Sequence, residues 1–257
     1  MEQPILTCRD VCFSYHSLSG ETIALDHISF QINKGEFVAI VGPSGCGKST
    51  LLSLIAGLTA PASGEILLQG AGREKIGYML QQDHLFEWRT IIKNILLGPE
   101  INRSLTKEKE EYAVKLLKDY GLYRFKDKKP AELSGGMKQR AALIRTMVME
   151  PELLLLDEPF SALDYQTRLM VSGDIGKIIK KTGITAILIT HDLSEAISLA
   201  DRIIVLSKRP ATVKKELAIH LTLPDDSPLA PRSAPEFSKY FSILWKEISD
   251  EYDANIF

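Results

Sequence analysis

The stretch GPSGCGKST at residues 42–50 constrains the fold of this chain more than any other. It lies between FVAIV (37–41), which has the composition of a buried strand, and LLSLIAGL (51–58), an apolar run of helical character. Its glycines let the backbone turn so that successive N–H groups point at one anion, and the start of the following helix adds partial positive charge. A strand, a G-x-x-x-x-G-K-[ST] loop and a helix in this order predict a phosphate-binding loop in an α/β fold.

The residues of this loop have separate expected parts in binding a nucleotide with Mg²⁺. Lys48 would neutralise the β- and γ-phosphates, the Ser49 hydroxyl would ligate Mg²⁺, and Thr50 would donate to the α-phosphate side. The other residues expected to contact the nucleotide are Gly42, Pro43, Ser44, Gly45, Cys46 and Gly47. A glycine-rich turn without a ligand is the structural alternative, which the flanking strand and helix disfavour.

Two adjacent carboxylates end a second apolar run, LLLLDEP (153–159). Carboxylates that leave a buried strand are costly unless they face a cation or a ligand. Asp157 suits a water-mediated contact with Mg²⁺, and Glu158, on the other side of the pleat, suits a general base that activates water. An acidic pair in solvent is the alternative, and the phosphate-binding loop makes it the weaker one.

Short apolar runs alternate with helical patterns through most of the chain. Strands are predicted at 37–41, 76–80, 153–157, 185–190 and 203–207. Three of these runs are continuously apolar, as expected for a mostly parallel sheet that is covered on both faces. Before them, LTCRDVCFSY (6–15) and ALDHISFQI (24–32) alternate in polarity and predict antiparallel strands.

Two regions depart from this alternation. No strand-like run occurs between about residues 88 and 150, where a helix is predicted from its cap Thr106 to Gly121, so we expect an inserted helical lobe. We therefore place one domain at 1–210 and a C-terminal extension at 211–257. The extension has a proline-rich segment and then an amphipathic helix, EFSKYFSILWKEI (236–248). We expect this helix to pack on the core, and a sensor of some signal is the alternative.

Composition excludes several classes of protein. A formal net charge of −2 argues against broad binding of nucleic acid. No apolar run approaches the roughly 20 residues of a membrane span, and the start MEQPILTCRD lacks the pattern of a signal peptide. The three cysteines, Cys8, Cys12 and Cys46, form neither a metal-ligand set nor a disulfide framework. We expect a cytosolic chain whose membrane role, if any, comes through a partner.

A second candidate anion site appears far from the first, in LSGGMKQR (133–140). Ser134 can cap a helix that continues through an apolar run, and Gly135 and Gly136 expose backbone N–H groups at its start. This element has no lysine loop of its own. The chain thus holds one complete half of a phosphate site and one complementary half.

Four motifs taken together resemble a known family. GPSGCGKST, LSGGMKQR, LLLLDEPFSALD (153–164) and ITHDLSEA (189–196) stand in the order found in the nucleotide-binding subunits of ABC transporters, over roughly residues 5–210. Within that family, WRT (88–90) and VLSKRPATV (205–213) resemble the nitrate, sulfonate and taurine import group. The resemblance implies a P-loop ATPase core with an N-terminal antiparallel β-subdomain and an inserted helical lobe.

The resemblance also implies the partners. It implies ATP with Mg²⁺ and a head-to-tail dimer of two copies, in which each Ser134–Gly136 segment meets the nucleotide of the other copy. It further implies integral membrane permease subunits, an extracellular solute-binding protein that acts indirectly, and a peripheral position at the cytoplasmic face of the membrane. No nucleic acid partner is implied.

Further roles carry over residue by residue. Gln81 matches the glutamine that contacts Mg²⁺ and the attacking water and leads to the permease-facing loop, although the adjacent Gln82 is a competing choice. His191 matches the histidine that contacts the γ-phosphate, Tyr15 matches the aromatic residue that stacks on adenine, and Asp164 matches the loop that couples the two subunits. The sequence departs from the family pattern at Met137, where glutamine is commoner, and at Glu87, where proline is frequent.

Other classes fit less well. ABC ATPases of DNA repair and chromosomes carry a very long coiled coil, which is missing here, and translation-type ABC proteins carry two cassettes. A kinase with the same loop leaves LSGG and His191 unexplained. A regulatory or assembly ATPase that lacks a permease is the remaining alternative.

Overall fold

The structure is a computed structural model that describes residues 4–17, 20–70, 72–225 and 227–253. Its centre is a six-stranded sheet in the order β5-β6-β7-β3-β8-β9. Five of its strands are the predicted ones: β3 (Phe37–Val41), β5 (Ile76–Met79), β6 (Leu153–Asp157), β7 (Thr185–Ile189) and β8 (Arg202–Leu206). These strands pair in parallel, and every residue of β3, β6 and β7 is buried, as their continuous apolar sequence predicts.

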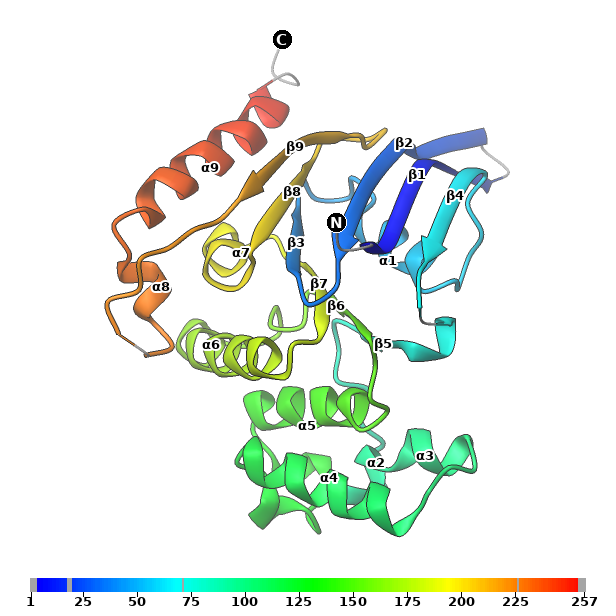
Figure 1. Cartoon of the computed structure of the whole chain (residues 1–257), viewed down its shortest axis with the longest axis vertical. Helices are drawn as coiled ribbons and strands as arrows, with labels where there is room; N and C mark the ends of the chain where they lie inside the picture. Colours follow the sequence, from blue (N-terminus) through cyan, green and yellow to red (C-terminus); the bar gives the residue numbers. More distant parts are fainter. Residues whose placement is uncertain (1–3, 18–19, 71, 226, 254–257) are drawn as a thin grey trace.

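A separate antiparallel sheet lies beside this centre (Figure 1). It has the order β2-β1-β4, with β1 (Pro4–Ser17), β2 (Gly20–Asn33) and β4 (Ser63–Leu68). The pairing of β1 with β2 confirms the two alternating strands expected at 6–15 and 24–32. The sequence did not predict β4, whose residues are exposed or only half-buried and include a glycine with φ of 79°.

The helical lobe is confirmed and lies at the bottom of Figure 1. It holds α2 (Ile91–Ile95), α3 (Leu97–Ile101), α4 (Lys107–Asp119), α5 (Gly135–Met147) and short 3₁₀ turns at Tyr123–Phe125 and Pro130–Glu132. Thr106 caps α4 as predicted, because its side chain accepts the Lys109 N–H. Ala113, Leu116 and Leu117 form the buried stripe of that helix.

The remaining helices cover the two faces of the central sheet. They are α1 (Lys48–Ile55), α6 (Tyr165–Thr182), α7 (Leu193–Leu199), α8 (Ala230–Ser233) and α9 (Phe237–Asp253), and a 3₁₀ turn at Arg73–Lys75 precedes β5. One hydrophobic core joins the sheet to α5, α6, α7 and the lobe, and a second joins it to α1 and the antiparallel sheet. Both faces of the central sheet are therefore buried.

The segment expected to follow the domain, from residue 211 on, continues the central sheet. Its strand β9 (Val213–Ala218) pairs antiparallel with β8. Because β9 is an edge strand with alternating exposure and the polar sequence VKKELA, it lacks the apolar signal of the other strands. The expected helix at 236–248 is confirmed within α9, which packs on the core through the fully buried Leu244. Residues 1–3 and 254–257, at the ends of the expected domain and extension, lie outside the described part of the chain.

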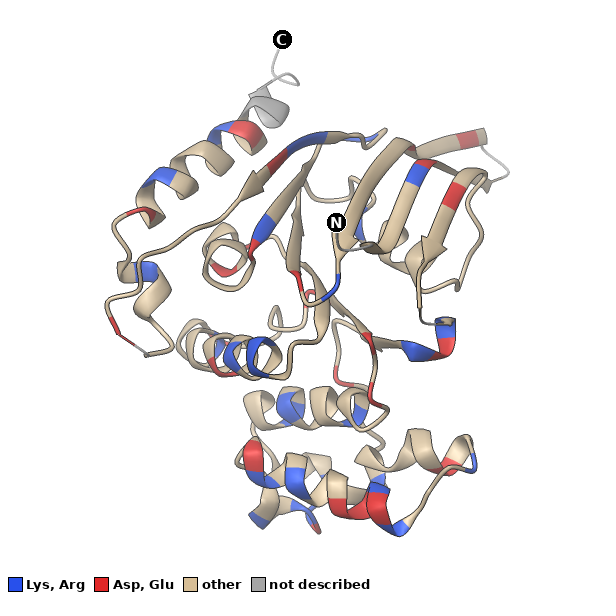
Figure 2. Cartoon of the chain, viewed as in Figure 1, with Lys and Arg blue, Asp and Glu red and all other residues tan. Residues whose placement is uncertain are grey.

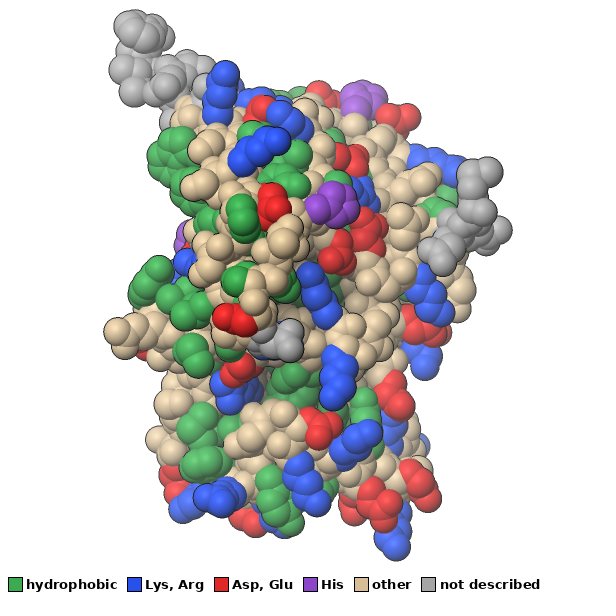
Figure 3. All heavy atoms as spheres, turned by 60° about the vertical axis from the view of Figure 1, so that its left-hand side comes forward, with side chains coloured by type: hydrophobic (Ala, Val, Ile, Leu, Met, Phe, Trp, Pro, Cys, Tyr) green, Lys and Arg blue, Asp and Glu red, His purple; other side chains and the backbone are tan. Residues whose placement is uncertain are grey.

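Charges of both signs gather on the helical lobe, whereas the strands of the central sheet carry few (Figure 2). On the face shown in Figure 3, basic and acidic side chains are interspersed. This pattern agrees with the net charge of −2. In the part of the chain that the structure describes, no helix is both long and apolar enough to span a bilayer.

A buried carboxylate, Glu195, fixes the turn between β7 and α7. Thr190 donates to its Oε2 at 2.6 Å, while Oε1 is buried with no hydrogen-bond partner among the described residues. Burial raises the pKa of Glu195 from 4.5 to about 7; the nearby Asp192 also raises it, and Arg168 and His191 oppose the shift. Glu195 therefore favours the native state in its protonated form.

We predict that replacing Glu195 with glutamine flattens the pH dependence of stability. A raised native pKa gives stability that is complete below the unfolded pKa near 4.5 and is lost as pH rises through about 7. The stability of the wild type relative to Glu195→Gln should therefore fall by roughly 3 kcal/mol between pH 4.5 and 8.5. Urea denaturation across this range measures the difference, with Glu110→Gln on the exposed face of α4 as control. A constant difference would contradict the burial account.

Candidate functional site

The largest group of predicted site residues meets at one edge of the central sheet. Residues that directly follow β3, β6 and β7 converge there, as expected where parallel strands end. A cavity of about 790 Å³ opens at this edge. Its lining is Val41, Gly42, Ser44, Gly45, Gly47, Lys48, Ser49, Thr50, Glu158, His191, Leu193, Arg209, Trp245 and Ile248.

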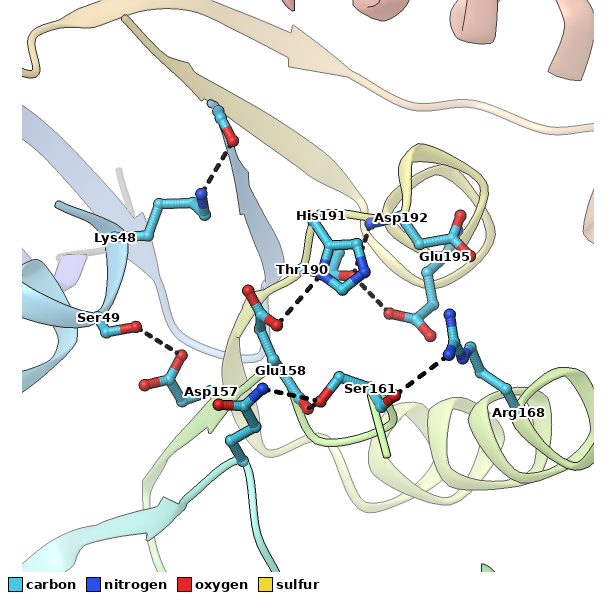
Figure 4. Close-up of polar contacts among 12 residues, drawn as sticks. Lys48, Ser49, Asp157, Glu158, Ser161, Arg168, Thr190, His191, Asp192 and Glu195 are labelled. Atoms are coloured by element: carbon cyan, nitrogen blue, oxygen red, sulfur yellow. Dashed lines mark hydrogen bonds and ion pairs between the residues drawn. The ribbon is translucent and has the colours of Figure 1, made fainter. Parts of the chain in front are cut away.

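The loop at 42–50 closes around the Lys48 ammonium. Its Nζ donates to the carbonyl oxygens of Gly42 and Pro43, both at 2.9 Å, and the side chain is buried (Figure 4). Gly47 has a φ of 123°, and a Cβ there would lie 2.9 Å from Leu25 Cδ2, so the turn requires glycine. A positive charge is thus held at the centre of the loop, at the start of α1, where an anion is favoured.

Two side chains with oxygen atoms, Ser49 and Asp157, bond to each other next to the lysine. The Ser49 hydroxyl donates to Asp157 Oδ1 at 3.0 Å, and Tyr78 donates to Oδ2 at 3.4 Å. Burial raises the pKa of Asp157, and Glu158 raises it further, while the hydrogen bond from Ser49 lowers it. A hydroxyl and a poorly hydrated carboxylate are oxygen donors of the kind that Mg²⁺ takes. The residues present therefore fit this ion.

Glu158 and His191 both line the cavity and contact each other. His191 Nδ1 lies 3.1 Å from Glu158 Oε2 (Figure 4). The Glu158 N–H donates to the Ile189 carbonyl at 2.9 Å. Glu158 has a φ of 44°, an uncommon conformation for a residue other than glycine. A carboxylate and an imidazole thus stand together over the phosphate-binding loop, where they can accept or donate protons.

Gln81 follows β5 and bonds to the segment after Glu158. Its Nε2 donates to Ser161 Oγ at 3.2 Å, and Ser161 Oγ donates in turn to the Glu158 carbonyl at 3.0 Å. Gln81 does not line the cavity itself. Its part as a ligand of Mg²⁺ stays a prediction.

Tyr15 lies next to the loop at the end of β1. Its hydroxyl is 2.8 Å from Thr50 Oγ1, and its ring packs edge-on against Phe13 with 5.0 Å between centroids. The side chain is 49% exposed, so one part of the ring is open to solvent. An exposed aromatic ring beside the loop is suited to stacking on a planar base.

The Ser134–Gly136 segment lies apart from the phosphate-binding loop. Ser134 caps α5 by accepting the Met137 N–H at 3.4 Å, as predicted, and none of the three residues lines the cavity. Asp164 likewise caps α6 by accepting the Thr167 N–H at 3.0 Å. Hydrogen bonds from the Thr167 side chain and backbone lower the pKa of Asp164. One chain therefore does not bring its two anion-binding elements together.

Sequence reasoning missed five residues of the cavity: Val41, Leu193, Arg209, Trp245 and Ile248. Arg209 Nη2 donates to the Gly45 carbonyl at 2.6 Å, and within the described residues Arg209 forms no ion pair. Arg209 lies in VLSKRPATV, so its charge was visible, although its contact with residue 45 was not. Nothing in the sequence around Trp245 signals that α9 reaches this cavity.

Comparison with known proteins agrees with this geometry. The family model described as "ABC transporter" matches residues 25–161. An uncharacterized ABC transporter ATP-binding protein of Bacillus subtilis (strain 168), YtlC, is 45% identical over 93% of this chain and 94% of its own length. The nitrate import ATP-binding protein NrtD of Synechocystis sp. is 41% identical, over 86% of each chain. The taurine import ATP-binding protein TauB of Roseobacter denitrificans is 39% identical, over 86% of this chain and 87% of its own.

Solved structures show the same architecture. The dimeric, post-hydrolysis ATP-binding cassette MJ0796 bound to ADP and Pi superposes with a TM-score of 0.71 at 32% identity, over 84% of this chain and 99% of that one. The structure of cbiO1 from Clostridium perfringens, part of an ABC transporter complex, gives a TM-score of 0.73 at 32% identity. This match covers 84% of this chain and 88% of that one. The chain therefore belongs to the ABC transporter family, as an ATP-binding subunit whose ATP hydrolysis is coupled to transport.

Proposed function

We propose that the chain powers a membrane importer for a small anionic solute such as nitrate, a sulfonate or taurine. One observation supports ATP hydrolysis at this site. Lys48, Glu158 and His191 line one cavity, and Ser134–Gly136 does not line it. Such a site holds a cation for phosphate and a base for water, yet one of the predicted phosphate-binding elements must come from elsewhere.

In this proposal the reaction is attack of water on the γ-phosphorus of ATP. Glu158 accepts a proton from the water, the bond from the γ-phosphorus to the bridging oxygen breaks, and ADP leaves. Lys48 and the loop N–H groups hold the phosphates, and Tyr15 stacks on the adenine. Ser49, Gln81 and, through water, Asp157 would hold Mg²⁺, whose charge offsets that of the phosphates. His191 contacts the γ-phosphate and, through its 3.1 Å contact, orients Glu158.

A second copy of the chain completes the site. A two-fold axis would place Ser134–Gly136 of each copy over the nucleotide of the other, and Asp164 would lie at the junction between the copies. The dimeric state of the MJ0796 cassette, which binds ADP and Pi, supports this arrangement. ATP then joins the two copies, and its hydrolysis lets them separate.

The membrane partners are proposed from an exposed surface next to Gln81. Phe86 and Trp88 stack with 4.7 Å between ring centroids, and Trp88 is 73% exposed. An aromatic pair left in solvent is typical of a docking surface, here for the permease subunits. The chain would thus lie peripherally at the cytoplasmic face of the membrane, and a solute-binding protein would act on the far side.

We predict that Glu158→Gln lowers ATP turnover by about 10²–10⁴, the usual contribution of a general base. ATP binding and dimer formation should persist, because glutamine keeps the shape of the side chain and removes only its basicity. Phosphate release and equilibrium ATP binding are the measurements. Glu152→Gln, at the residue before β6 begins, serves as control. Normal turnover in Glu158→Gln would exclude this residue as the base.

We also predict that two inactive variants restore activity when mixed. Lys48→Ala damages the loop, and Ser134→Arg damages the segment proposed to act in the other copy. A mixed dimer then has one intact site, formed by Lys48 of one copy and Ser134 of the other. Hydrolysis should rise from background on mixing, whereas two preparations of the same variant should stay inactive. If mixing restores nothing although mixed dimers form, each site is built within one chain.

The solute can be tested with the assembled transporter. The relatives named for nitrate and taurine import lead us to predict that an anion of this size stimulates ATP hydrolysis several-fold. The measurement is phosphate release by the complex reconstituted in vesicles with its permease and solute-binding protein, with nitrate, sulfonates and taurine added in turn. Uncharged sugars of similar size are the control. Stimulation by the sugars alone would overturn the anion assignment.

A further inference from the structure

We propose that α9 carries part of the surface on which a second copy of the chain docks, with Trp245 as its apolar anchor. This inference rests on the dimer proposed above and extends its interface to the C-terminal helix. It assigns a binding role to a helix that we expected only to pack on the core.

The first observation is the place of α9 in the fold. Trp245 and Ile248 line the same cavity as Lys48, Glu158 and His191, so the helix forms one wall of the nucleotide site. The helix is firmly held, because Leu244 is fully buried. Glu247 also ties it to β9 by an ion pair with Lys215 at 2.7 Å. The wall is thus a fixed part of the molecule.

The second observation is the exposure of Trp245. Its side chain is 60% exposed, although Leu244 beside it is fully buried. The ring stacks on Phe241, with 6.2 Å between centroids and 10° between planes, which limits its freedom before any contact forms. Large, pre-ordered aromatic side chains are the usual anchors of protein interfaces, since burying them releases much apolar surface at little cost in entropy.

The third observation identifies the occupant. The adenine is expected at Tyr15, which does not line this cavity, so the base leaves Trp245 uncovered. The permease is expected beside the helical lobe, which lies at the bottom of Figure 1, whereas α9 lies at the top. A second copy, by contrast, must approach this cavity to bring Ser134–Gly136 to the phosphates. Trp245 continues the surface that this copy already has to cover.

The composition of the chain gives a direct test. It contains two tryptophans, Trp88 and Trp245, so Trp88→Phe leaves Trp245 as the only one. In a Trp88→Phe, Glu158→Gln protein, we expect ATP to produce dimers and to lower iodide quenching of Trp245 fluorescence at least threefold. Light scattering on the same samples follows dimer formation. If dimers form and iodide still quenches Trp245 as strongly as in the monomer, the inference is overturned while the proposed function stands.

A control separates the second copy from the nucleotide. Ser134→Arg in the same background should bind ATP but stay monomeric. Iodide should then quench its Trp245 fluorescence as strongly as without ATP. If ATP lowers iodide quenching of Trp245 in these monomers as well, then ATP itself covers Trp245, and the inference is wrong. If the parent protein binds ATP and no dimer forms, the proposed dimer fails, and this inference fails with it.

A second variant measures the contribution to affinity. Trp245→Ala should weaken the ATP-bound dimer by about tenfold or more, as expected for an interface anchor. Trp245→Phe should retain most of the affinity. ATP binding to each monomeric variant is measured as well, so that dimer affinities are compared at equal occupancy by ATP. Leu58→Ala, at an exposed apolar residue outside the cavity, is the control and should leave the dimer unaffected. Equal dimer affinity in Trp245→Ala would contradict the inference.

Discussion

One backbone hydrogen bond past the end of a strand determines much of this site. The Glu158 N–H donates to the Ile189 carbonyl at 2.9 Å, and this bond extends the pairing of β6 with β7 by one residue. The bond holds Glu158 at a φ of 44°, a conformation that costs energy in a residue other than glycine. Ser161 holds the next peptide group, since its hydroxyl donates to the Glu158 carbonyl. The surrounding sheet thus stabilises a strained backbone that directs the carboxylate toward His191.

The charges beside this carboxylate suit a ligand that carries both signs of charge. Lys48 is held by neutral carbonyls, and Asp157 is buried beside hydroxyls with a raised pKa, so neither charge is fully compensated. Buried charges of this kind are stabilised by a partner of opposite sign. A nucleotide with a bound cation supplies both signs at once. The site is therefore expected to bind them together more strongly than either alone.

The sequence predicted what depends on local pattern and missed what depends on distant contacts. The apolar runs at 37–41 and 153–157 gave strands with the predicted bounds, because burial on both faces leaves a continuous signal. The edge strand β9 carries no such signal, since half of its residues face water. Arg209 and Gly45 stand 164 positions apart, and only the folded chain shows that they touch. The place of Trp245 depends in the same way on how α9 crosses the end of the sheet.

Two kinds of contact would close the dimer: apolar burial of Trp245 and polar contacts with the γ-phosphate. They differ in whether they depend on the bound nucleotide. Burial of Trp245 is apolar, so salt hardly screens it and its free energy is the same with ATP or ADP in the site. A contact that is equal in two ligand states cannot shift the balance between them. Discrimination must therefore come from the groups that we propose to meet the γ-phosphate, which are Lys48, His191 and Ser134 of the second copy. In this arrangement α9 sets how tightly the copies associate, and the phosphate contacts decide when they do.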